Sequence, residues 1–359
     1  MKKNFLFKFS AIAMSLILIA CGGSTSEDVV ETETTAIESE ESLNVVVTTP
    51  MLGEFVKQVA GDSVVLDVLM PAEADPHTYD PSPQDAAKIA DADIVLYVGI
   101  KYETSSLLKL IENTASTNAT LLEIGEEIDP IEFKDGEHDH GNHDDHDEEG
   151  HDDDKDHDHD DEDGHDDHDE EGHEGHEGHD HGSEDPHFWF DPVRVAMAVE
   201  VIKDSLVSLD PANTSTYEAN ADNFISELTD LDAQVKELIE SVSEDNRKIV
   251  TTHEALGYLE ARYGIEVFAT IIPSLSTADE ISPSQIADVI DVIEDNNIKV
   301  LFVESEAPSV YAETVAAEAG ITAVTGLYVE TLKDGQTYSD FLISNVTLIV
   351  ESLNSAGEG

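Results

Sequence analysis

The chain of 359 residues has little cysteine, little basic charge and no long apolar run. Its single cysteine, Cys21, excludes internal disulfides and clusters of thiolate metal ligands. Lysine and arginine number 17 against 81 aspartates and glutamates, and the formal net charge is −64. Such a surface repels nucleic acid and anionic membrane faces, so neither is expected as a partner. Apolar residues make up 40% of the chain, enough for the cores of two ordinary domains.

The start of the chain has the pattern of a secretion signal. Three lysines among the first eight residues precede an apolar stretch at 9–20, which is too short to span a bilayer comfortably. This stretch ends in Leu18-Ile19-Ala20-Cys21, which resembles a bacterial lipobox. We therefore expect a lipoprotein signal peptide over 1–21, acylation of the Cys21 thiol, and a flexible tether to the membrane over 22–42.

Histidine is concentrated in one acidic run in the middle of the chain. Between Glu137 and Asp185 there are 26 acidic residues and one lysine, with no apolar side chain to bury. This composition predicts a disordered, solvated loop over 135–185. Imidazole and carboxylate at this density favour binding of divalent transition metals over a plain acidic spacer. The expected secondary metal ligands are 13 of the 16 histidines of the chain: His138, His140, His143, His146, His151, His157, His159, His165, His168, His173, His176, His179 and His181.

Strands alternate with helices on both sides of a long helical segment. Short runs rich in β-branched residues predict strands at 43–49, 63–70, 93–98, 120–124, 248–252, 267–272, 299–304 and 321–325. Apolar positions at helical spacing predict one helix from Pro211 to about Ser243, long enough to join two domains stiffly. The alternation implies an α/β fold with parallel strands and right-handed crossovers.

Three histidines, His77, His187 and His253, lie outside the acidic run. Zinc sites commonly use three or four such ligands. In open α/β sheets, ligands collect beyond the carboxyl ends of the strands. His77 and His253 follow predicted strands in this way, one in each half of the chain. The sequence therefore predicts a metal site shared by two lobes across a cleft.

Three motifs carry a resemblance to a known family. The segments Asp75–Pro81 (DPHTYDP), Asp185–Pro192 (DPHFWFDP) and Thr252–Tyr258 (THEALGY) resemble the metal-binding receptors of bacterial ABC importers for zinc and manganese. The likeness runs from about Leu43 to Leu353 and includes the lipobox. The His-rich acidic loop between the first two motifs is similar to that of the zinc-uptake branch.

The resemblance implies two lobes, each with a four-stranded parallel sheet flanked by helices, joined by one long linking helix. The corresponding divisions are an N-terminal lobe at 43–210, the linking helix at 211–243 and a C-terminal lobe at 244–355. The resemblance also makes His77, His187 and His253 the first three ligands of a metal held between the lobes. The fourth ligand in that family is usually an Asp near the last strand, where this chain has Glu330 at a slightly different spacing from Gly335. Glu304, or a water molecule, is the alternative.

Three imidazoles and one carboxylate suit Zn²⁺, whereas the manganese branch of the family typically replaces the third histidine with a carboxylate. Because imidazole must be neutral to bind a metal, affinity should fall below a pH of about 6.5. The expected protein is a lipid-anchored, monomeric receptor on the extracytoplasmic face of the membrane. It would capture Zn²⁺ and deliver it to an ABC permease with a cytoplasmic ATPase. Asp75, Asp80 and Asp191 are candidates for orienting the histidine rings, although turn and helix-capping roles explain each of them as well.

Other functions are compatible with parts of the pattern. A receptor for Mn²⁺ or another divalent metal would share the same family motifs. A cell-surface adhesin or passive metal buffer would use only the charged tether and the His-rich run. A zinc hydrolase is weakly indicated, because His253-Glu254 begins like the H-E-x-x-H motif but has Gly257 in place of the second histidine. We therefore expect no catalytic residue and no enzyme activity.

Overall fold

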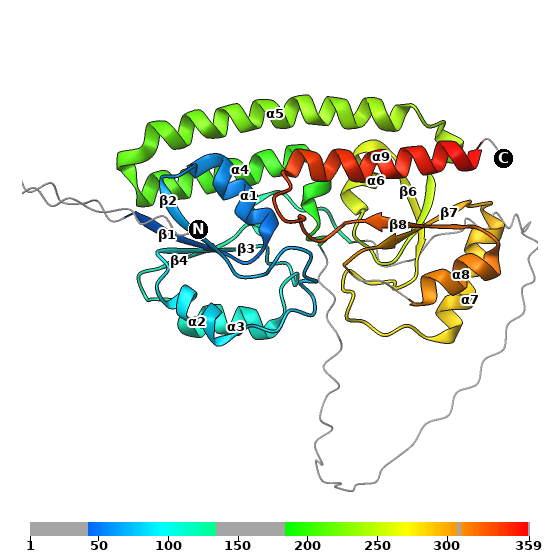
Figure 1. Ribbon diagram of the computed structural model, residues 1–359, viewed down its shortest axis with the longest axis horizontal. Coiled ribbons are helices and arrows are strands. Elements are labelled where there is room, and N and C mark those ends of the chain that lie inside the picture. Colours follow the sequence, from blue (N-terminus) through cyan, green and yellow to red (C-terminus); the bar gives the residue numbers. More distant parts are fainter. Residues whose placement is uncertain (1–41, 134–183, 307–309, 358–359) are drawn as a thin grey trace, which may run out of the picture. The chain divides into compact units, whose positions relative to one another are not determined.

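The computed structural model describes residues 42–133, 184–306 and 310–357 (Figure 1). The expected signal peptide with Cys21, almost all of the expected tether, and the thirteen histidines of the acidic run lie outside these ranges. The described residues from Ser42 onward form one compact unit. No helix within the described ranges is both long and apolar enough to cross a bilayer.

The first sheet has four parallel strands in the order β2-β1-β3-β4. Val46 packs with residues of α2 (Pro83–Ala90) and α3 (Ser105–Thr114) on one face of the sheet, whereas Val45 and Val47 face the helices on the other side. This division follows from the alternation of side chains along a strand. The strands are β1 (Leu43–Val47), β2 (Val64–Val68), β3 (Ile94–Tyr97) and β4 (Thr120–Glu123).

The second sheet repeats this arrangement with the order β6-β5-β7-β8, again with parallel pairing. In β7 (Val300–Glu304), Leu301 packs in a core with residues of α7 (Pro283–Asp295) and α8 (Val310–Ala319), and its neighbours Val300 and Phe302 point to the opposite face. Both faces of the strand are therefore covered, as parallel sheets require. The strands are β5 (Lys248–Thr251), β6 (Glu266–Thr270), β7 (Val300–Glu304) and β8 (Thr322–Leu327).

Several helices begin at sequence signals that the chain supplies locally. Thr49 caps α1 through its side chain, and Ser82 and Ser282 form capping boxes at α2 and α7 with proline in the first turn. Apart from the long helix α5 (Thr214–Glu240), the helices in chain order are α1 (Pro50–Ala60), α2 (Pro83–Ala90), α3 (Ser105–Thr114), α4 (Pro192–Leu209), α6 (Gly257–Tyr263), α7 (Pro283–Asp295), α8 (Val310–Ala319) and α9 (Tyr338–Gly357). Short 3₁₀ helices occupy Gly125–Glu127, Phe188–Phe190, Pro211–Asn213 and Glu244–Asn246.

The long helix α5 (Thr214–Glu240) connects the part of the chain that forms the first sheet to the part that forms the second. It lies beside α4, α1 and α9 along one side of the two sheets (Figure 1). Its buried side chains recur at helical spacing on one face: Tyr217, Ala221, Phe224, Leu228, Leu231, Val235 and Ile239. This apolar stripe attaches the connecting helix to the body of the protein over most of its length.

A single hydrophobic core extends under both sheets. It contains Val45 and Ile94 from the first sheet, Ile249 and Phe302 from the second, and the buried faces of the helices that lie beside α5. Because interiors are packed as densely as organic crystals, this shared layer fixes the carboxyl ends of the two sets of strands relative to one another. Side chains placed at those ends can therefore form one site.

The predicted fold is confirmed, with two four-stranded parallel sheets, flanking helices and a long helix between them. Most predicted element bounds agree with the observed ones within two or three residues. The long helix differs at its start, because Pro211–Asn213 form a 3₁₀ turn and the α-helix runs for 27 residues from Thr214. A 3₁₀ turn is common at helix ends. The division into lobes at 211–243 stays a prediction.

Candidate metal centre

Four buried side chains from distant parts of the chain meet at the carboxyl ends of the strands. His77 lies on the loop after β2, His253 follows β5, and Glu330 follows β8. His187 directly precedes the 3₁₀ helix Phe188–Phe190, which leads into α4. The two sheets thus contribute ligand groups to one place, as the position of ligand sites in α/β folds leads one to expect.

The four side chains each offer one ligand atom, and these atoms lie within 4.8 Å of one another. Oε1 of Glu330 is 3.4 Å from Nε2 of His77, 3.4 Å from Nε2 of His187 and 2.7 Å from Nε2 of His253. Ligands of a tetrahedral zinc ion with bonds of about 2.0–2.1 Å are about 3.4 Å apart. Two of the three measured separations therefore match the edge of a tetrahedral site.

The ligand atoms are buried and have no hydrogen-bond partner among the described residues. This applies to Nε2 of all three histidines and to both carboxylate oxygens of Glu330. A buried polar atom without a partner costs about 1–3 kcal/mol, so four such side chains facing one another need an explanation. Together, the three histidines and Glu330 could hold a metal ion, which would satisfy one atom of each.

Two of the three rings are oriented by carboxylates on their other nitrogen. Nδ1 of His187 is 2.8 Å from Oδ1 of Asp185, which also accepts the backbone N–H of His187 at 2.9 Å. Nδ1 of His253 is 2.5 Å from Oε2 of Glu304, and Oε1 of Glu304 accepts the backbone N–H of His253 at 3.0 Å. A carboxylate behind the ring fixes the tautomer and leaves Nε2 to bind the metal.

His77 is held differently. Asp75 accepts the backbone N–H of His77 at 2.9 Å, but Nδ1 of the ring has no hydrogen-bond partner among the described residues. The ring instead packs edge-on against Tyr102, with the centroids 5.2 Å apart. The second oxygen of Asp75 accepts the hydroxyl of Thr277 at 2.7 Å, from the loop that precedes α7. The turn that carries His77 is thus tied to the part of the chain that forms the second sheet.

Glu330 is placed by residues on both sides of the site. The carboxyl group of Glu306 accepts the backbone N–H groups of Val329, Glu330 and Thr331 at 3.2–3.4 Å. From the first half of the chain, the Tyr102 hydroxyl donates to the carbonyl of Glu330 at 2.8 Å. Trp189 likewise donates from Nε1 to the carbonyl of Val329 at 2.7 Å. Five hydrogen bonds therefore fix the backbone that carries the carboxylate.

Burial and neighbouring charges shift the pKa values of several side chains in and around this group. Burial opposes the charged form of each residue, but the histidines outweigh it and hold the pKa of Glu330 well below its usual range. Burial is likewise outweighed at His187, where Glu330 and Asp185 raise the pKa to about 9, and at His253, where Glu304 raises it well above its ordinary value. Burial and the charge of Glu330 raise the pKa of Glu306 to about 8. Near pH 7 the neutral Glu306 then adds no second negative charge beside Glu330.

The structure brings together His77, His187, His253 and Glu330, whereas Glu304, the alternative to Glu330, lies behind the His253 ring. None of the three aspartates proposed to orient rings contacts a ring nitrogen through a hydrogen bond that the structure describes. Asp191 caps α4 at Val193.

The residues that orient the rings were not identified from the sequence. Asp185 and Glu304 perform this task, but only Asp185 has a local signal in the sequence. Asp185 stands two residues before His187, as Asp75 does before His77. Glu304 ends the strand next to the one that leads to His253. Phe188 and Trp189, which directly follow His187, are fully buried.

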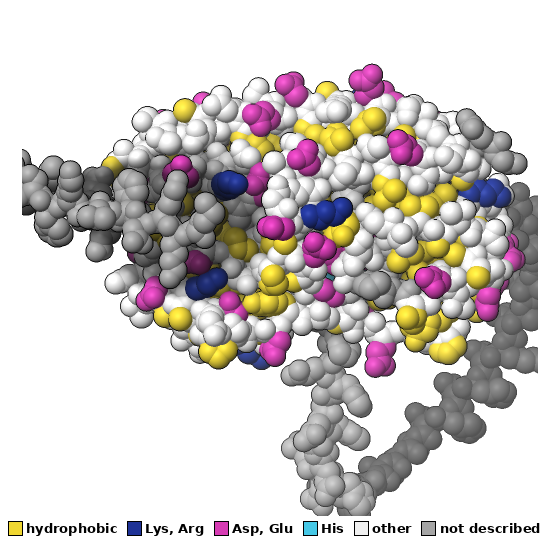
Figure 2. Space-filling view, in the orientation of Figure 1, with side chains coloured by type: hydrophobic (Ala, Val, Ile, Leu, Met, Phe, Trp, Pro, Cys, Tyr) yellow, Lys and Arg dark blue, Asp and Glu magenta, His cyan; other side chains and the backbone are white. Residues whose placement is uncertain are grey.

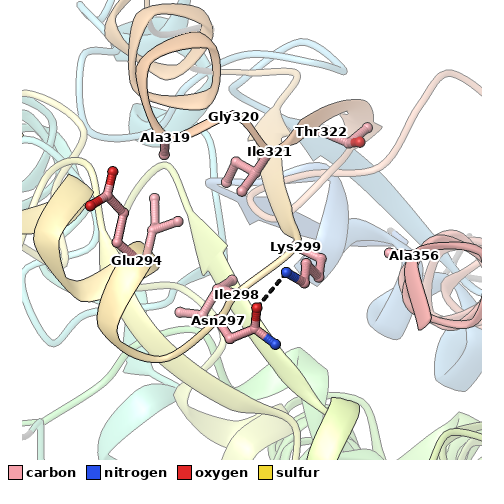
Figure 3. Close-up of a pocket in the computed structure, with 10 residues that line it drawn as sticks. Glu294, Asn297, Ile298, Lys299, Ala319, Gly320, Ile321, Thr322 and Ala356 are labelled. Atoms are coloured by element: carbon pink, nitrogen blue, oxygen red, sulfur yellow. Dashed lines mark hydrogen bonds between the residues drawn. The ribbon is translucent and has the colours of Figure 1, made fainter. Parts of the chain in front are cut away.

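The four side chains of the metal group lie buried beneath the surface. In the face shown in Figure 2, Asp and Glu side chains are scattered among a few Lys and Arg, and histidine is hardly visible. A hollow of about 380 Å³ lies instead at the start of β7 and β8, where Lys299 contacts Asn297 (Figure 3). That is the amino end of the strands, opposite to the ligand group. We therefore assign the site to the buried cluster.

Comparison with known proteins identifies the family of this chain. The sequence pattern of the family described as "Zinc-uptake complex component A periplasmic" (ZnuA) matches residues 45–352. The chain belongs to this family. Its members are the substrate-binding receptors of metal ABC transporters. The predicted family and the predicted receptor function are thereby confirmed.

Relatives within the family are named for two different metals. The manganese-binding lipoprotein MntA of Halalkalibacterium halodurans is 25% identical over 358 residues, which cover 98% of this chain and 99% of the relative. The high-affinity zinc uptake system protein ZnuA of Bacillus subtilis is 28% identical over 358 residues, with coverage of 98% and 99%. Family membership therefore establishes a metal receptor without distinguishing zinc from manganese.

A solved structure supports the fold. The periplasmic zinc binding protein TroA of Treponema pallidum superposes with a TM-score of 0.69 at 22% sequence identity, covering 86% of this chain and 98% of that chain. The ZnuA-family chain thus has the fold of that protein.

Proposed function

We propose that this protein captures Zn²⁺ outside the cytoplasm and delivers it to an ABC permease driven by a cytoplasmic ATPase. The observation that carries the proposal is the convergence of three imidazole Nε2 atoms and one carboxylate, all buried and without hydrogen-bond partners among the described residues. His77, His187, His253 and Glu330 are the proposed ligands. No catalytic step is required, because capture and release are the whole task.

The donor set favours zinc over manganese. Zinc commonly takes four ligands in a tetrahedron with imidazole nitrogen among them, whereas manganese prefers carboxylate and other oxygen donors. Here nitrogen outnumbers oxygen by three to one, and the rings of His187 and His253 are turned toward the site by carboxylates behind them. Manganese is the second candidate, because MntA of H. halodurans, a relative over nearly the whole chain, is named for that metal.

Calorimetry with defined metals tests the proposal. In a chain that lacks residues 137–182, Zn²⁺ should bind at one tight site that His77→Ala removes, and Mn²⁺ should not displace it. Tight binding of Mn²⁺ with weak binding of Zn²⁺ would support the manganese alternative. If zinc bound only weakly and His77→Ala had no effect, the protein would be a passive buffer and not a receptor.

The proposed setting is the outer face of the cell membrane, with a monomer anchored by lipid on Cys21 after cleavage of residues 1–21. Several relatives carry the word lipoprotein in their names, which supports this placement. Cys21→Ala should move the protein from the membrane fraction to the medium or periplasm. Its zinc affinity should not change, because Cys21 contributes no ligand.

The His-rich run is proposed to gather zinc weakly and raise its concentration near the main site. The borders of this run are held together, because Glu132 pairs with Glu184 in an antiparallel bridge and the N–H of Asp185 donates to Ile131 at 3.0 Å. A deletion of residues 137–182 keeps these contacts. Cells with this deletion should grow normally in ample zinc and poorly under severe zinc limitation. Equal growth in both media would exclude a scavenging role.

A further inference from the structure

The hydroxyl of Tyr258 connects the second half of the chain to the turn that carries His187. Tyr258 lies in α6 and is 1% exposed. Its hydroxyl donates to the backbone carbonyl of Asp185 at 2.9 Å and accepts the backbone N–H of Ile131 at 3.2 Å. A single phenol therefore holds the two backbone segments on either side of residues 134–183.

The residue held in this way also orients a ligand. Oδ1 of Asp185 accepts the backbone N–H of His187 and lies 2.8 Å from Nδ1 of its ring. The other carboxylate oxygen lies against Gly257, where a built Cβ would come within 2.5 Å of it. Gly257 thus lies against the carboxylate of Asp185, and its neighbour Tyr258 binds the backbone carbonyl of the same residue.

We propose that Tyr258 is a positioning residue for metal capture, acting on His187 through Asp185. The inference deepens the proposed function, on which it rests. The hydroxyl fixes the backbone of Asp185, and this backbone determines where the carboxylate stands behind the ring. A carboxylate that shifts by a fraction of an ångström turns the imidazole and moves Nε2 away from the other ligands. Because α6 follows His253 closely in the chain, the same short segment sets the orientation of two ligands.

The competing explanation is that Tyr258 only fills space in the core. A phenylalanine distinguishes the two roles, because it keeps the ring and removes the hydroxyl. Tyr263 supplies a matched control on the same helix. It is also buried, and its hydroxyl donates to Oδ1 of Asp232 at 2.7 Å, away from the ligand group. Tyr263→Phe therefore removes an equivalent hydrogen bond without touching Asp185.

The first measurement is zinc affinity by competition with a chelator, in the chain without residues 137–182. Replacing an outer partner of a ligand typically costs about 10–100-fold in metal affinity, and Tyr258 acts one contact further out. We expect Tyr258→Phe to weaken binding by about 3–10-fold and Tyr263→Phe to weaken it by less than about 2-fold. Thermal unfolding of both variants verifies that each is folded.

The second measurement reports the arrangement of the ligands themselves. Co²⁺ in a four-coordinate site absorbs visible light far more strongly than in a six-coordinate one, so its spectrum reports coordination geometry. Tyr258→Phe should weaken or shift these bands, and Tyr263→Phe should leave them unchanged. In an Asp185→Asn background, the effect of Tyr258→Phe on affinity should largely vanish, because both changes act on His187 through the carboxylate of Asp185.

The outcomes separate this inference from the function on which it rests. If the unaltered chain lacked a tight zinc site sensitive to His77→Ala, the proposed receptor function itself would fail. If that site were present but the two phenylalanine variants had equal affinities and equal cobalt spectra, only the role of Tyr258 would be overturned. Additive losses in the Asp185→Asn background would also overturn it, because Tyr258 would then act by another route.

Discussion

The carboxylate of Glu304 binds both the backbone and the ring of His253. Its Oε1 accepts the His253 N–H at 3.0 Å, and its Oε2 lies 2.5 Å from Nδ1. The other ring nitrogen is thereby directed at Glu330, 2.7 Å away. A residue at the end of one strand thus determines which nitrogen the histidine at the end of the neighbouring strand presents to a metal.

Replacing Glu304 by glutamine should weaken zinc binding by about 10–100-fold, the usual cost of losing an outer partner of a ligand. Glutamine keeps the size of the side chain but removes the charge that makes the ring a better donor. Chelator competition measures the change. Asp210→Asn serves as the control, because that carboxylate accepts hydrogen bonds from Tyr217 and Asn213 away from the site. Unchanged affinity in Glu304→Gln would show that Glu304 does not tune the ligand.

Zinc affinity should keep rising with pH well above 6.5. Burial would lower the pKa of His187, but Glu330 and Asp185 raise it to about 9, so at pH 7 a proton must leave before Nε2 can bind a metal. Each proton released adds a tenfold gain in affinity per pH unit until the pKa is passed. Titration at pH 6, 7, 8 and 9 checks this, and calorimetry in buffers of different ionisation enthalpy counts the protons. An affinity that levels off at pH 6.5 would contradict it.

The raised pKa of His187 also affects the folding stability of the metal-free protein, which should fall as the pH rises. Because the folded pKa of His187 lies above the unfolded value of about 6.5, its charged contact with Glu330 stabilises the fold fully below pH 6.5. That stabilisation is lost as pH rises through about 9. The melting temperature without metal should therefore fall over this interval. With saturating zinc it should stay nearly constant, so the gap between the two curves should widen.

The fold could be predicted because its signals are local. Runs of β-branched residues such as Val45–Val47 favour strands buried on both faces, and Ser82 and Ser282 mark helix starts through their own hydrogen bonds. The three histidine ligands could be identified because they are the three histidines of the sequence that lie outside the acidic run. The first residue of the long α-helix could not be predicted from the sequence, since Pro211 fits a 3₁₀ turn as well as the first turn of an α-helix.

The partners of the ligands could not be predicted in the same way. Glu304 meets His253 across a strand pair, and the Tyr102 hydroxyl meets the carbonyl of Glu330 across 228 residues of sequence. The first contact depends on which strands of the second sheet are neighbours, and the second depends on how the two sheets are held by their common core. No local pattern encodes either arrangement. The sequence favoured Glu330 over Glu304 only through the family resemblance, because both carboxylates end or follow strands at the same edge of one sheet.

Gly257 should tolerate no side chain. A Cβ at this position would lie 2.5 Å from Oδ2 of Asp185, so Gly257→Ala must push away the carboxylate that orients His187. We expect a loss of stability of about 1–3 kcal/mol, as for other overpacked sites, together with weaker zinc binding. Gly53→Ala is the control, since its Cβ would meet only Val68 and Val47 in the first sheet. It should lower the melting temperature without changing zinc affinity. Equal affinities in the two variants would show that Asp185 can move without consequence.

Thr277 should control how fast zinc leaves. Its hydroxyl donates to Oδ2 of Asp75 at 2.7 Å, and Oδ1 of the same carboxylate accepts the backbone N–H of His77. His77 is the one ligand ring without a carboxylate on Nδ1, so its position depends on this turn. Thr277→Val keeps the shape of the side chain and removes the donor. An unpaired acceptor costs about 1–3 kcal/mol when buried, and Asp75 is only partly buried, so we expect about the lower limit.

That cost corresponds to zinc release about 5-fold faster in Thr277→Val, because 1.4 kcal/mol is a factor of ten in rate. Stopped-flow mixing of the zinc-loaded protein with excess chelator measures the rate directly. Thr277→Ser retains the hydroxyl and should release zinc at nearly the original rate. If the valine and serine variants released zinc equally fast, the contact with Asp75 would not hold His77 in place. The rate of release would then depend on the carboxylate-oriented ligands, His187 and His253, and on Glu330.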